Sequence, residues 1–290
     1  YRRDPLHQGR QVRLSGHERR VPVVAGMRPK PSLGQNFLKN PGIVDKIIRF
    51  SEVKRSDTVL EIGPGTGMLT GRLLECASRV IAVEKDDALA EALREKFGDE
   101  QGFSLIHADI LECDFRELVK PGTKIVANLP YNIATTVALR LVDAADMLSS
   151  VVVMVQKEVG MRICAPPGDT EYSALTVVLS SVFECTPGFV VGPKNFSPQP
   201  KVDSLVIKLV PKEQPLPRAE MDDFKKIVFG TFGQRRKMLR NSLMSIPGVT
   251  RDLLPHIERL AGVSLEKRPQ QLSWEDYQEL ARAYRKLVAS

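Results

Sequence analysis

The stretch that decides the fold is Thr58-Val59-Leu60-Glu61-Ile62-Gly63-Pro64-Gly65-Thr66-Gly67. Its β-branched and apolar start predicts a buried strand, and a helical pattern follows the glycines. Glycines at such a turn let the backbone approach a ligand closely and leave amide N–H groups free at the helix N-terminus. A dinucleotide fingerprint would need glycine where Met68 stands, so the GxGxG spacing disfavours NAD.

Three further strand patterns follow this turn, and each leads to a polar side chain. The patterns cover residues 79–83, 103–107 and 124–127, and the polar residues are Glu84, Asp109 and Asn128. In a doubly wound sheet, these strand ends open on one crevice. A carboxylate at Glu84 can accept hydrogen bonds from both hydroxyls of a ribose, and one at Asp109 can meet an adenine amine. Glu84 alone would also fit a solvated surface position, but the series predicts a site for an adenosine-containing ligand.

Asn128-Leu129-Pro130-Tyr131 follows the last of these strand patterns. Asn128 offers a carboxamide oxygen, and Pro130 restricts the backbone that carries the Leu129 carbonyl. Tyr131 adds a flat aromatic face. Together they suit a planar group that carries an NH2, although a turn with a satisfied Asn and a core Tyr would also fit these four residues alone.

Five motifs in order resemble the KsgA-type small-subunit rRNA adenine N6,N6-dimethyltransferase family. They cover residues 34–38, 61–67, 128–131, 156–159 and 198–204. Residues 232–243 resemble that family's C-terminal region, so the resemblance runs from Pro31 to the C-terminus. Gln199 and Gly160 depart from the commonest family pattern, but neither occupies a matched catalytic position.

The resemblance implies an α/β fold of the Rossmann-like, class I SAM-dependent methyltransferase type. About seven strands with helices on both faces would be followed by a small C-terminal α-helical domain. It implies S-adenosylmethionine (SAM) as methyl donor and dimethylation of N6 of two adjacent adenosines near the 3′ end of small-subunit rRNA. The implied partner is that rRNA within a pre-ribosomal small subunit, and we expect a cytoplasmic monomer without a metal ion.

The resemblance also assigns roles to individual residues. It implies that Asn128 and Leu129 accept hydrogen bonds from the target amine, that Pro130 directs the Leu129 carbonyl and that Tyr131 stacks on the base. Phe196 would close the other face of the base, with a core aromatic before a proline turn as the alternative. On the cofactor side, the implied residues are Gln35, Asn36 and Leu38 over the methionine, Gly63, Gly65 and Gly67 beneath it, Glu84 on the ribose and Asp109 on the adenine. Asn128 is expected to bind the cofactor as well as the target amine.

The charge of the chain is unevenly distributed along its length. Residues 1–30 hold eight Lys/Arg against two Asp/Glu, residues 31–210 hold nineteen against twenty-three, and residues 211–290 hold fifteen against ten. The phosphate-binding surface is therefore expected outside the catalytic part. The candidate RNA-binding residues, predicted to lie on a single helix, are Arg235, Arg236, Lys237 and Arg240. A solvated basic face is the alternative for this cluster.

The chain divides into four predicted segments. Residues 1–30 form a basic, disordered extension, and we expect Met27 to be the natural start. Residues 31–210 form the catalytic domain, with later strands near 151–155, 181–186 and 204–210. Three prolines mark a linker over 211–218, and residues 219–290 form a helical rRNA-binding domain. Ser273 and Asp276 predict a capped helix start.

The cysteines and the hydropathy of the chain indicate the compartment in which the protein is expected. The four cysteines show no pairing pattern, which favours a reducing compartment and disfavours disulfides and structural zinc. No apolar run approaches the roughly 20 residues of a membrane span, so we expect a soluble protein without a membrane partner. Two other functions stay open: a large-subunit rRNA adenine methyltransferase of the antibiotic-resistance type, and an organellar transcription or binding factor derived from a methyltransferase.

Overall fold

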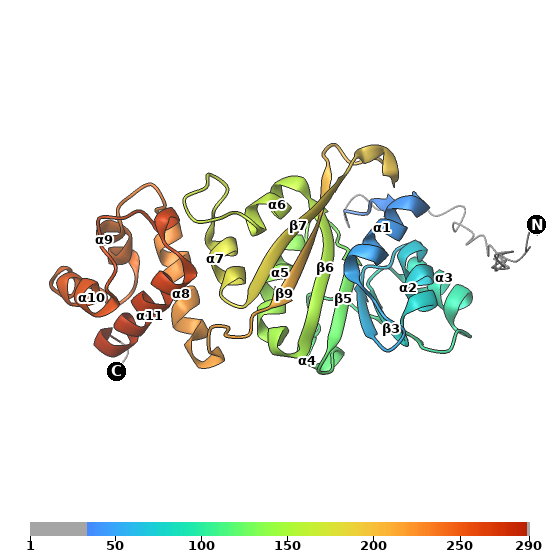
Figure 1. Ribbon diagram of the computed structural model, residues 1–290, viewed down its shortest axis with the longest axis horizontal. Coiled ribbons are helices and arrows are strands. Elements are labelled where there is room, and N and C mark those ends of the chain that lie inside the picture. The colour runs from blue at the N-terminus through green and yellow to red at the C-terminus, as the bar shows by residue number, and fades with distance from the viewer. Residues whose placement is uncertain (1–33, 289–290) are drawn as a thin grey trace, which may run out of the picture.

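A computed structural model describes residues 34–288 of the chain. The predicted disorder of residues 1–30 and the predicted start at Met27 lie outside the described residues and stay predictions. Figure 1 shows an elongated molecule with a central sheet and a group of helices beyond one end of it. No helix between residues 34 and 288 is both long and apolar enough to cross a membrane.

The central sheet has seven strands in the order β4-β3-β2-β5-β6-β9-β7. The strands from β4 to β6 pair in parallel, and β9 runs antiparallel to both β6 and β7. The order reverses where β5 lies beside β2, and ligands bind at the carboxyl ends of strands at such a reversal. The strands are β2 (Thr58–Ile62), β3 (Arg79–Glu84), β4 (Phe103–His107), β5 (Thr123–Asn128), β6 (Leu148–Gln156), β7 (Phe183–Val191) and β9 (Ser204–Pro211). The predicted fold class is confirmed.

Side chains of the central strands alternate between two hydrophobic cores, one on each face of the sheet. On β5, Ile125 belongs to the larger core and Val126 to the smaller one. On β6, Val153 and Met154 divide in the same way. Successive side chains of a strand point to opposite faces, so a continuous apolar run such as 151–155 is typical of a strand that is covered on both sides.

Helices cover both faces of this sheet (Figure 1). Val44 of α1 and Leu73 of α2 pack in the smaller core, whereas Val137 of α5 packs in the larger one. The helices before residue 181 are α1 (Pro41–Ser51), α2 (Met68–Cys76), α3 (Asp87–Phe97), α4 (Phe115–Leu118), α5 (Ala134–Leu141), the 3-10 helix η2 (Val142–Met147), α6 (Lys157–Ile163) and α7 (Ala174–Ser180).

The part that follows β9 is helical, as predicted. Its α-helices are α8 (Met221–Phe232), α9 (Leu239–Ser242), α10 (Leu254–Ala261) and α11 (Trp274–Val288). The predicted cap is confirmed, because Asp276 N–H donates to Ser273 Oγ (3.2 Å) and Ser273 N–H donates to Asp276 Oδ2 (3.0 Å). The larger core continues from the sheet into these helices. The division into a catalytic domain, a linker and an RNA-binding domain stays a prediction.

One strand extends beyond its predicted end. β7 covers residues 183–191, whereas the sequence predicted 181–186. Pro187 and Gly188 interrupt the apolar pattern, and the pairing of β7 with β9 shifts register between Pro187 and Val190. Such an irregularity lets a strand continue past residues that usually end one.

The expected absence of disulfides is wrong. Cys164, which follows α6, and Cys185 on β7 form a disulfide bond, with Cα atoms 5.4 Å apart. The two residues are 21 positions apart in the sequence, and only the packing of α6 against β7 brings them together. No spacing pattern signals such a pairing. The cysteines therefore no longer support a reducing compartment.

Candidate active site

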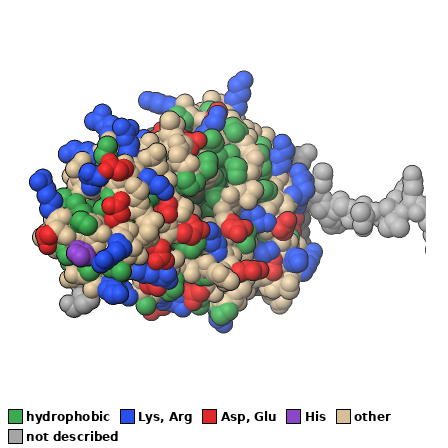
Figure 2. Space-filling view, turned by 60° about the vertical axis from the view of Figure 1, so that its left-hand side comes forward, with side chains coloured by type: hydrophobic (Ala, Val, Ile, Leu, Met, Phe, Trp, Pro, Cys, Tyr) green, Lys and Arg blue, Asp and Glu red, His purple; other side chains and the backbone are tan. Residues whose placement is uncertain are grey.

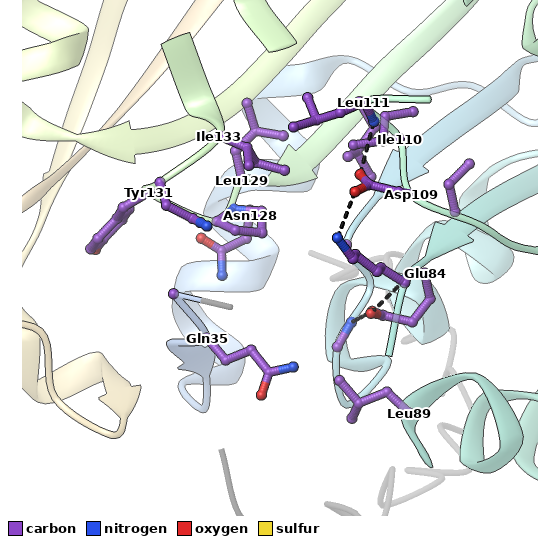
Figure 3. A pocket seen from close by; sticks show the side chains of 18 of the residues that line it. Gln35, Glu84, Leu89, Asp109, Ile110, Leu111, Asn128, Leu129, Tyr131 and Ile133 are labelled. Atoms are coloured by element: carbon purple, nitrogen blue, oxygen red, sulfur yellow. Dashed lines mark hydrogen bonds and ion pairs between the residues drawn. The ribbon is translucent and has the colours of Figure 1, made fainter. Parts of the chain in front are cut away.

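A pocket opens at the carboxyl ends of β2, β3, β4 and β5, beside the reversal of strand order (Figure 3). The predicted site residues that line it are Gln35, Asn36, Gly63, Gly65, Glu84, Asp109, Asn128, Leu129, Pro130 and Tyr131. Leu38, Gly67 and Phe196 do not line it. The successive strand ends thus converge on one site, as the sequence predicted.

The turn between β2 and α2 borders the pocket with glycine backbone. Gly63, Gly65 and Gly67 have φ angles of +65°, +56° and +75°, a left-handed region that favours glycine. A Cβ on Gly65 would lie 2.9 Å from the Phe37 ring, so close packing also requires glycine there. A Cβ on Gly67 would lie 2.6 Å from the Phe97 ring of α3. The third glycine therefore serves helix packing, while the first two line the pocket.

Glu84 ends β3, and backbone N–H groups fix its carboxylate. Oε2 accepts a hydrogen bond from Gly65 N–H (3.2 Å), and Oε1 accepts from the N–H groups of Lys85 and Asp86 (both 2.9 Å). Burial raises the pKa of Glu84 above its ordinary value, and these hydrogen bonds oppose the rise. Oε2, with one protein donor, is the oxygen with more capacity for a ligand hydroxyl.

Asp109 forms an ion pair that the sequence did not predict. Its Oδ2 lies 2.6 Å from Lys85 Nζ, and its Oδ1 accepts a hydrogen bond from Leu111 N–H (2.9 Å). Burial raises the pKa of Asp109, but the hydrogen bonds from Lys85 and Leu111 and the charge of Lys85 outweigh it, so the pKa is lowered. Lys85 was missed because a lysine after a strand usually belongs to the surface. Its position directly after Glu84 was the available signal.

Asn128 stands between the two sides of the site. Figure 3 shows Tyr131 on one side of it and Glu84 and Asp109 on the other. Asn128 Nδ2 donates to the Asn36 carbonyl (3.1 Å). A carbonyl can only accept, so this bond sets the amide orientation and turns Oδ1 away from Asn36. No group within residues 34–288 donates to Oδ1.

Leu129 and Tyr131 lie with Asn128 on one side of the pocket, the target side, which is where the sequence predicts the target amine. Leu129 N–H donates to the Met154 carbonyl (3.1 Å), while no group of the described chain donates to the Leu129 carbonyl. The Tyr131 ring is half-buried, and its hydroxyl lies 2.7 Å from Ser204 Oγ. The pocket therefore offers two acceptor oxygens and one aromatic ring on this side, which suits a planar group that carries an amine.

The structure differs from the prediction for Phe196 and Leu38. Strands β1 (Phe37–Leu38) and β8 (Phe196–Ser197) pair antiparallel in a small sheet that the sequence did not predict. Phe196 is 0% exposed and Leu38 is 6% exposed, and both pack in the smaller core. The Phe196 ring is therefore a core aromatic before a proline turn, which is the alternative that the sequence left open. The β1–β8 pairing instead anchors the segment that carries Gln35 and Asn36 into the pocket.

Glu61, in β2 beside the glycine turn, received no role from the sequence, yet its pKa is strongly raised. It is 1% exposed, and burial raises its pKa to about 8, with the negative charge of Glu84 adding to the rise. Its Oε2 atom makes no hydrogen bond to the rest of the described chain. The raised pKa favours the protonated, neutral form of Glu61 at pH 7.

The predicted single basic helix is wrong. α8 ends at Phe232, residues 233–238 form a turn, and α9 begins at Leu239. The N–H groups of Leu239 and Arg240 donate to the carbonyls of Lys267 (2.8 Å) and Leu265 (3.1 Å). These tertiary bonds take the donors that a continuous helix would use within itself.

The four basic residues consequently differ in availability. Arg240 pairs with Glu266, and Arg235 donates to the Thr170 carbonyl (3.2 Å). Arg236 and Lys237 are exposed and form no ion pair within residues 34–288. Figure 2, which brings the end with the C-terminal helices forward, shows Lys and Arg intermixed with Asp and Glu on this face.

The strand order, the glycine turn and the fixed Glu84 define a Rossmann-like methyltransferase of class I. The model of the family "Ribosomal RNA adenine dimethylase" matches residues 26–286. The chain belongs to this family, which confirms the resemblance carried by the five sequence motifs.

Known relatives agree with this membership. "Ribosomal RNA small subunit methyltransferase A" of Geobacter sulfurreducens is 39% identical over 263 residues, which cover 89% of this chain and 95% of the relative. The protein of that name from Clostridium botulinum (strain Kyoto / Type A2) is 39% identical over 255 residues, 86% of this chain and 92% of the relative.

Two solved structures resemble the whole described fold. A dimethyladenosine transferase from Plasmodium falciparum matches with a TM-score of 0.71 and 28% identity, over 86% of this chain and 98% of its own. The 23S rRNA methyltransferase ErmE matches with a TM-score of 0.66 and 26% identity, over 86% of this chain and 99% of its own.

Proposed function

We propose that the protein uses SAM to dimethylate N6 of two adjacent adenosines near the 3′ end of small-subunit rRNA. The observation that carries this proposal is the pair of unpaired acceptors, Asn128 Oδ1 and the Leu129 carbonyl, beside a pocket with an adenosine-binding arrangement. The small-subunit methyltransferases named above are 39% identical, whereas the 23S enzyme is 26% identical, which favours the small subunit as target. The intact glycine turn and Glu84 argue against a binding factor that has lost catalysis.

The residues of the pocket fit SAM. Glu84 would accept from the ribose, Asp109 from the adenine amine, and the backbone at Gly63 and Gly65 would pass beneath the methionine part, which Gln35 and Asn36 would cover. When bound, SAM supplies an electrophilic methyl group. Leu38 would support this segment from the core. No cluster of His, Cys, Asp and Glu that could hold a metal occurs within residues 34–288, and a metal-free reaction stays a prediction.

The acceptors on the target side compensate for the poor nucleophilicity of the adenine N6 amine. The N6 lone pair of adenine is delocalised into the ring, so the amine attacks poorly. Hydrogen bonds from N6–H to Asn128 Oδ1 and the Leu129 carbonyl localise that lone pair and stabilise the positive charge that N6 gains. The proton leaves N6 as or after the bond forms, so no strong base is required. Pro130 fixes the direction of the carbonyl, and Tyr131 stacks on the flipped base.

We also propose that the enzyme acts as a cytoplasmic monomer on a pre-ribosomal small subunit. Residues 31–210 would carry catalysis, and residues 219–290 would bind rRNA beyond the linker at 211–218. Within the basic turn, Arg236 and Lys237 are the residues best placed to bind phosphates, because neither has an acidic partner in the described chain.

Mass spectrometry of ribosomal RNA from a strain that lacks this gene, with and without the gene restored, tests the proposal. We expect two N6,N6-dimethyladenosines in small-subunit rRNA only when the gene is present. A gene-dependent methyl group in large-subunit rRNA would support the resistance-type alternative. Unchanged rRNA methylation would favour a binding factor.

A further inference from the structure

A hydrogen bond joins the target side of the pocket to a distant strand. The Tyr131 hydroxyl lies 2.7 Å from Ser204 Oγ, and the two residues are 73 positions apart. Ser204 is the first residue of β9, and its backbone pairs with Gln156 of β6 on one side and Val191 of β7 on the other. Two neighbouring strands therefore hold Ser204 in place.

The two hydroxyls depend on each other. Ser204 is 0% exposed, and its Oγ has no other hydrogen bond within residues 34–288. A buried hydroxyl without a partner is costly, so Ser204 needs the tyrosine. Burial raises the pKa of Tyr131, and the hydrogen bond to Ser204 opposes the rise. A tyrosine hydroxyl is protonated at neutral pH even at its ordinary pKa of about 10, so it is able to bond there.

This bond fixes the orientation of a half-buried ring. A tyrosine side chain turns about two torsions, and a bond at the far end of the ring restrains both of them. The ring lies directly after Leu129 and Pro130, which line the same pocket. A ring that is already oriented loses little rotational freedom when a base stacks on it, so capture of the base is more favourable.

We propose that Ser204 is a positioning residue that orients Tyr131 to receive the target adenine. This inference deepens the proposed function and rests on it. Ser204 does not touch the substrate itself, and its effect passes through the Tyr131 hydroxyl. Removal of either hydroxyl should therefore have the same consequence, and removal of both should add nothing further.

A double-mutant cycle tests this coupling. Ser204→Ala, Tyr131→Phe and the double variant are compared for methyl transfer to unmethylated small subunits. We expect each single variant to raise KM by about 2–10-fold, the range for removal of one hydrogen bond, and the double variant to match the singles. SAM affinity, measured by calorimetry, should stay unchanged in all three. Independent effects that multiply in the double variant, or a Tyr131→Phe enzyme with wild-type KM, would overturn the inference.

Ser181→Ala is the matched control. Ser181 is also 0% exposed, but its hydroxyl donates to the Val178 carbonyl of the preceding helix (2.8 Å). We expect it to lower the melting temperature without raising KM, and an equal rise in KM would overturn the inference. Should Ser204→Ala fail to fold, Tyr131→Phe alone decides through its KM. A wild-type protein that methylates no adenine would refute the proposed function and the inference together.

Discussion

The two sides of Asn128 use their hydrogen-bond acceptors differently. On the cofactor side, protein donors already bond the Glu84 carboxylate and the Asp109 carboxylate. On the target side, Asn128 Oδ1 and the Leu129 carbonyl have no donor from residues 34–288. The cofactor side is thus oriented in advance by the protein, while the target side keeps its acceptors for the amine of the substrate.

This difference has an energetic consequence. Asn128 is partly exposed, so water can donate to its side-chain oxygen until a base enters the pocket. Once the base displaces that water, an acceptor left without a donor would cost about 1–3 kcal/mol, and an amine that donates to it avoids this cost. The target side therefore favours a group with N–H donors, and favours it most when that group gains positive charge in the transition state. Substitutions on the two sides should accordingly affect rate and cofactor binding separately.

Asn128→Ala should give the largest effect, and that effect should fall mainly on the reaction of the target amine. We expect methyl transfer to fall by about 10²–10³, by analogy with the loss of one donor that stabilises a transition state, and SAM binding to stay near wild type. Tritium transfer from labelled SAM to unmethylated small subunits in a single turnover measures the rate. A near wild-type rate would remove Asn128 from catalysis.

Tyr131→Ala is the companion variant on the same side. Loss of the ring should raise KM together with any fall in kcat, because stacking binds the base before and during reaction. Tyr131→Phe should be milder, since it keeps the ring and loses only the bond to Ser204.

Glu84→Ala should weaken the binding of SAM on the cofactor side. Ribose hydroxyls would lose charge-assisted hydrogen bonds, so SAM binding should weaken by about 2–3 kcal/mol. Calorimetry with SAM or its demethylated product measures this loss, and Glu91→Ala, an exposed position on α3, is the control. Unchanged affinity in Glu84→Ala would refute the ribose assignment.

Glu61→Gln should test whether the buried carboxyl beside the glycine turn makes the stability of the protein depend on pH. Burial raises the folded-state pKa of Glu61 to about 8 from 4.5. Between these values, the folded protein keeps a proton that the unfolded chain releases, so stability falls as pH rises. The slope from this group is at most about 1.4 kcal/mol per pH unit, and Glu61→Gln should remove it. Urea unfolding at pH 5 to 8 measures the slope, and equal slopes in both proteins would contradict the prediction.

Neutralising the basic cluster should weaken RNA binding without changing single-turnover methylation at saturating RNA. Glutamine at Arg235, Arg236, Lys237 and Arg240 should flatten the dependence of log K on log salt, by up to about one unit for each phosphate that the protein no longer binds. Arg236 and Lys237 should account for most of the change, because Arg240 already pairs with Glu266. An unchanged slope would mark the cluster as a solvated basic face.

Local patterns explain why much of this fold and site was predictable. The apolar run at 58–62 and the glycines after it signal a strand and a turn within a few residues, and parallel strands then bring Glu84, Asp109 and Asn128 to one edge. What the sequence missed depends on interactions between distant segments. Examples are the disulfide bond between Cys164 and Cys185 and the burial of Phe196, whose strand β8 pairs with β1. A third is the break before Leu239, where the carbonyls of Lys267 and Leu265 accept the N–H groups that a continuous helix would use.

Lys85→Gln should give the smallest effect and test whether the cofactor side depends on side-chain charge or on backbone. Lys85 is 57% exposed and Asp109 is 16% exposed, and an ion pair with one partner in water contributes little because the solvent screens it. Asp109 would keep the bond from Leu111 N–H, so its carboxylate should stay oriented. We expect SAM affinity to fall less than about fivefold, and the difference from wild type to shrink at high salt, which screens exposed charges. Calorimetry at low and high salt measures both. A loss as large as that of Glu84→Ala would show that Lys85 orients the cofactor side as strongly as the backbone N–H groups do.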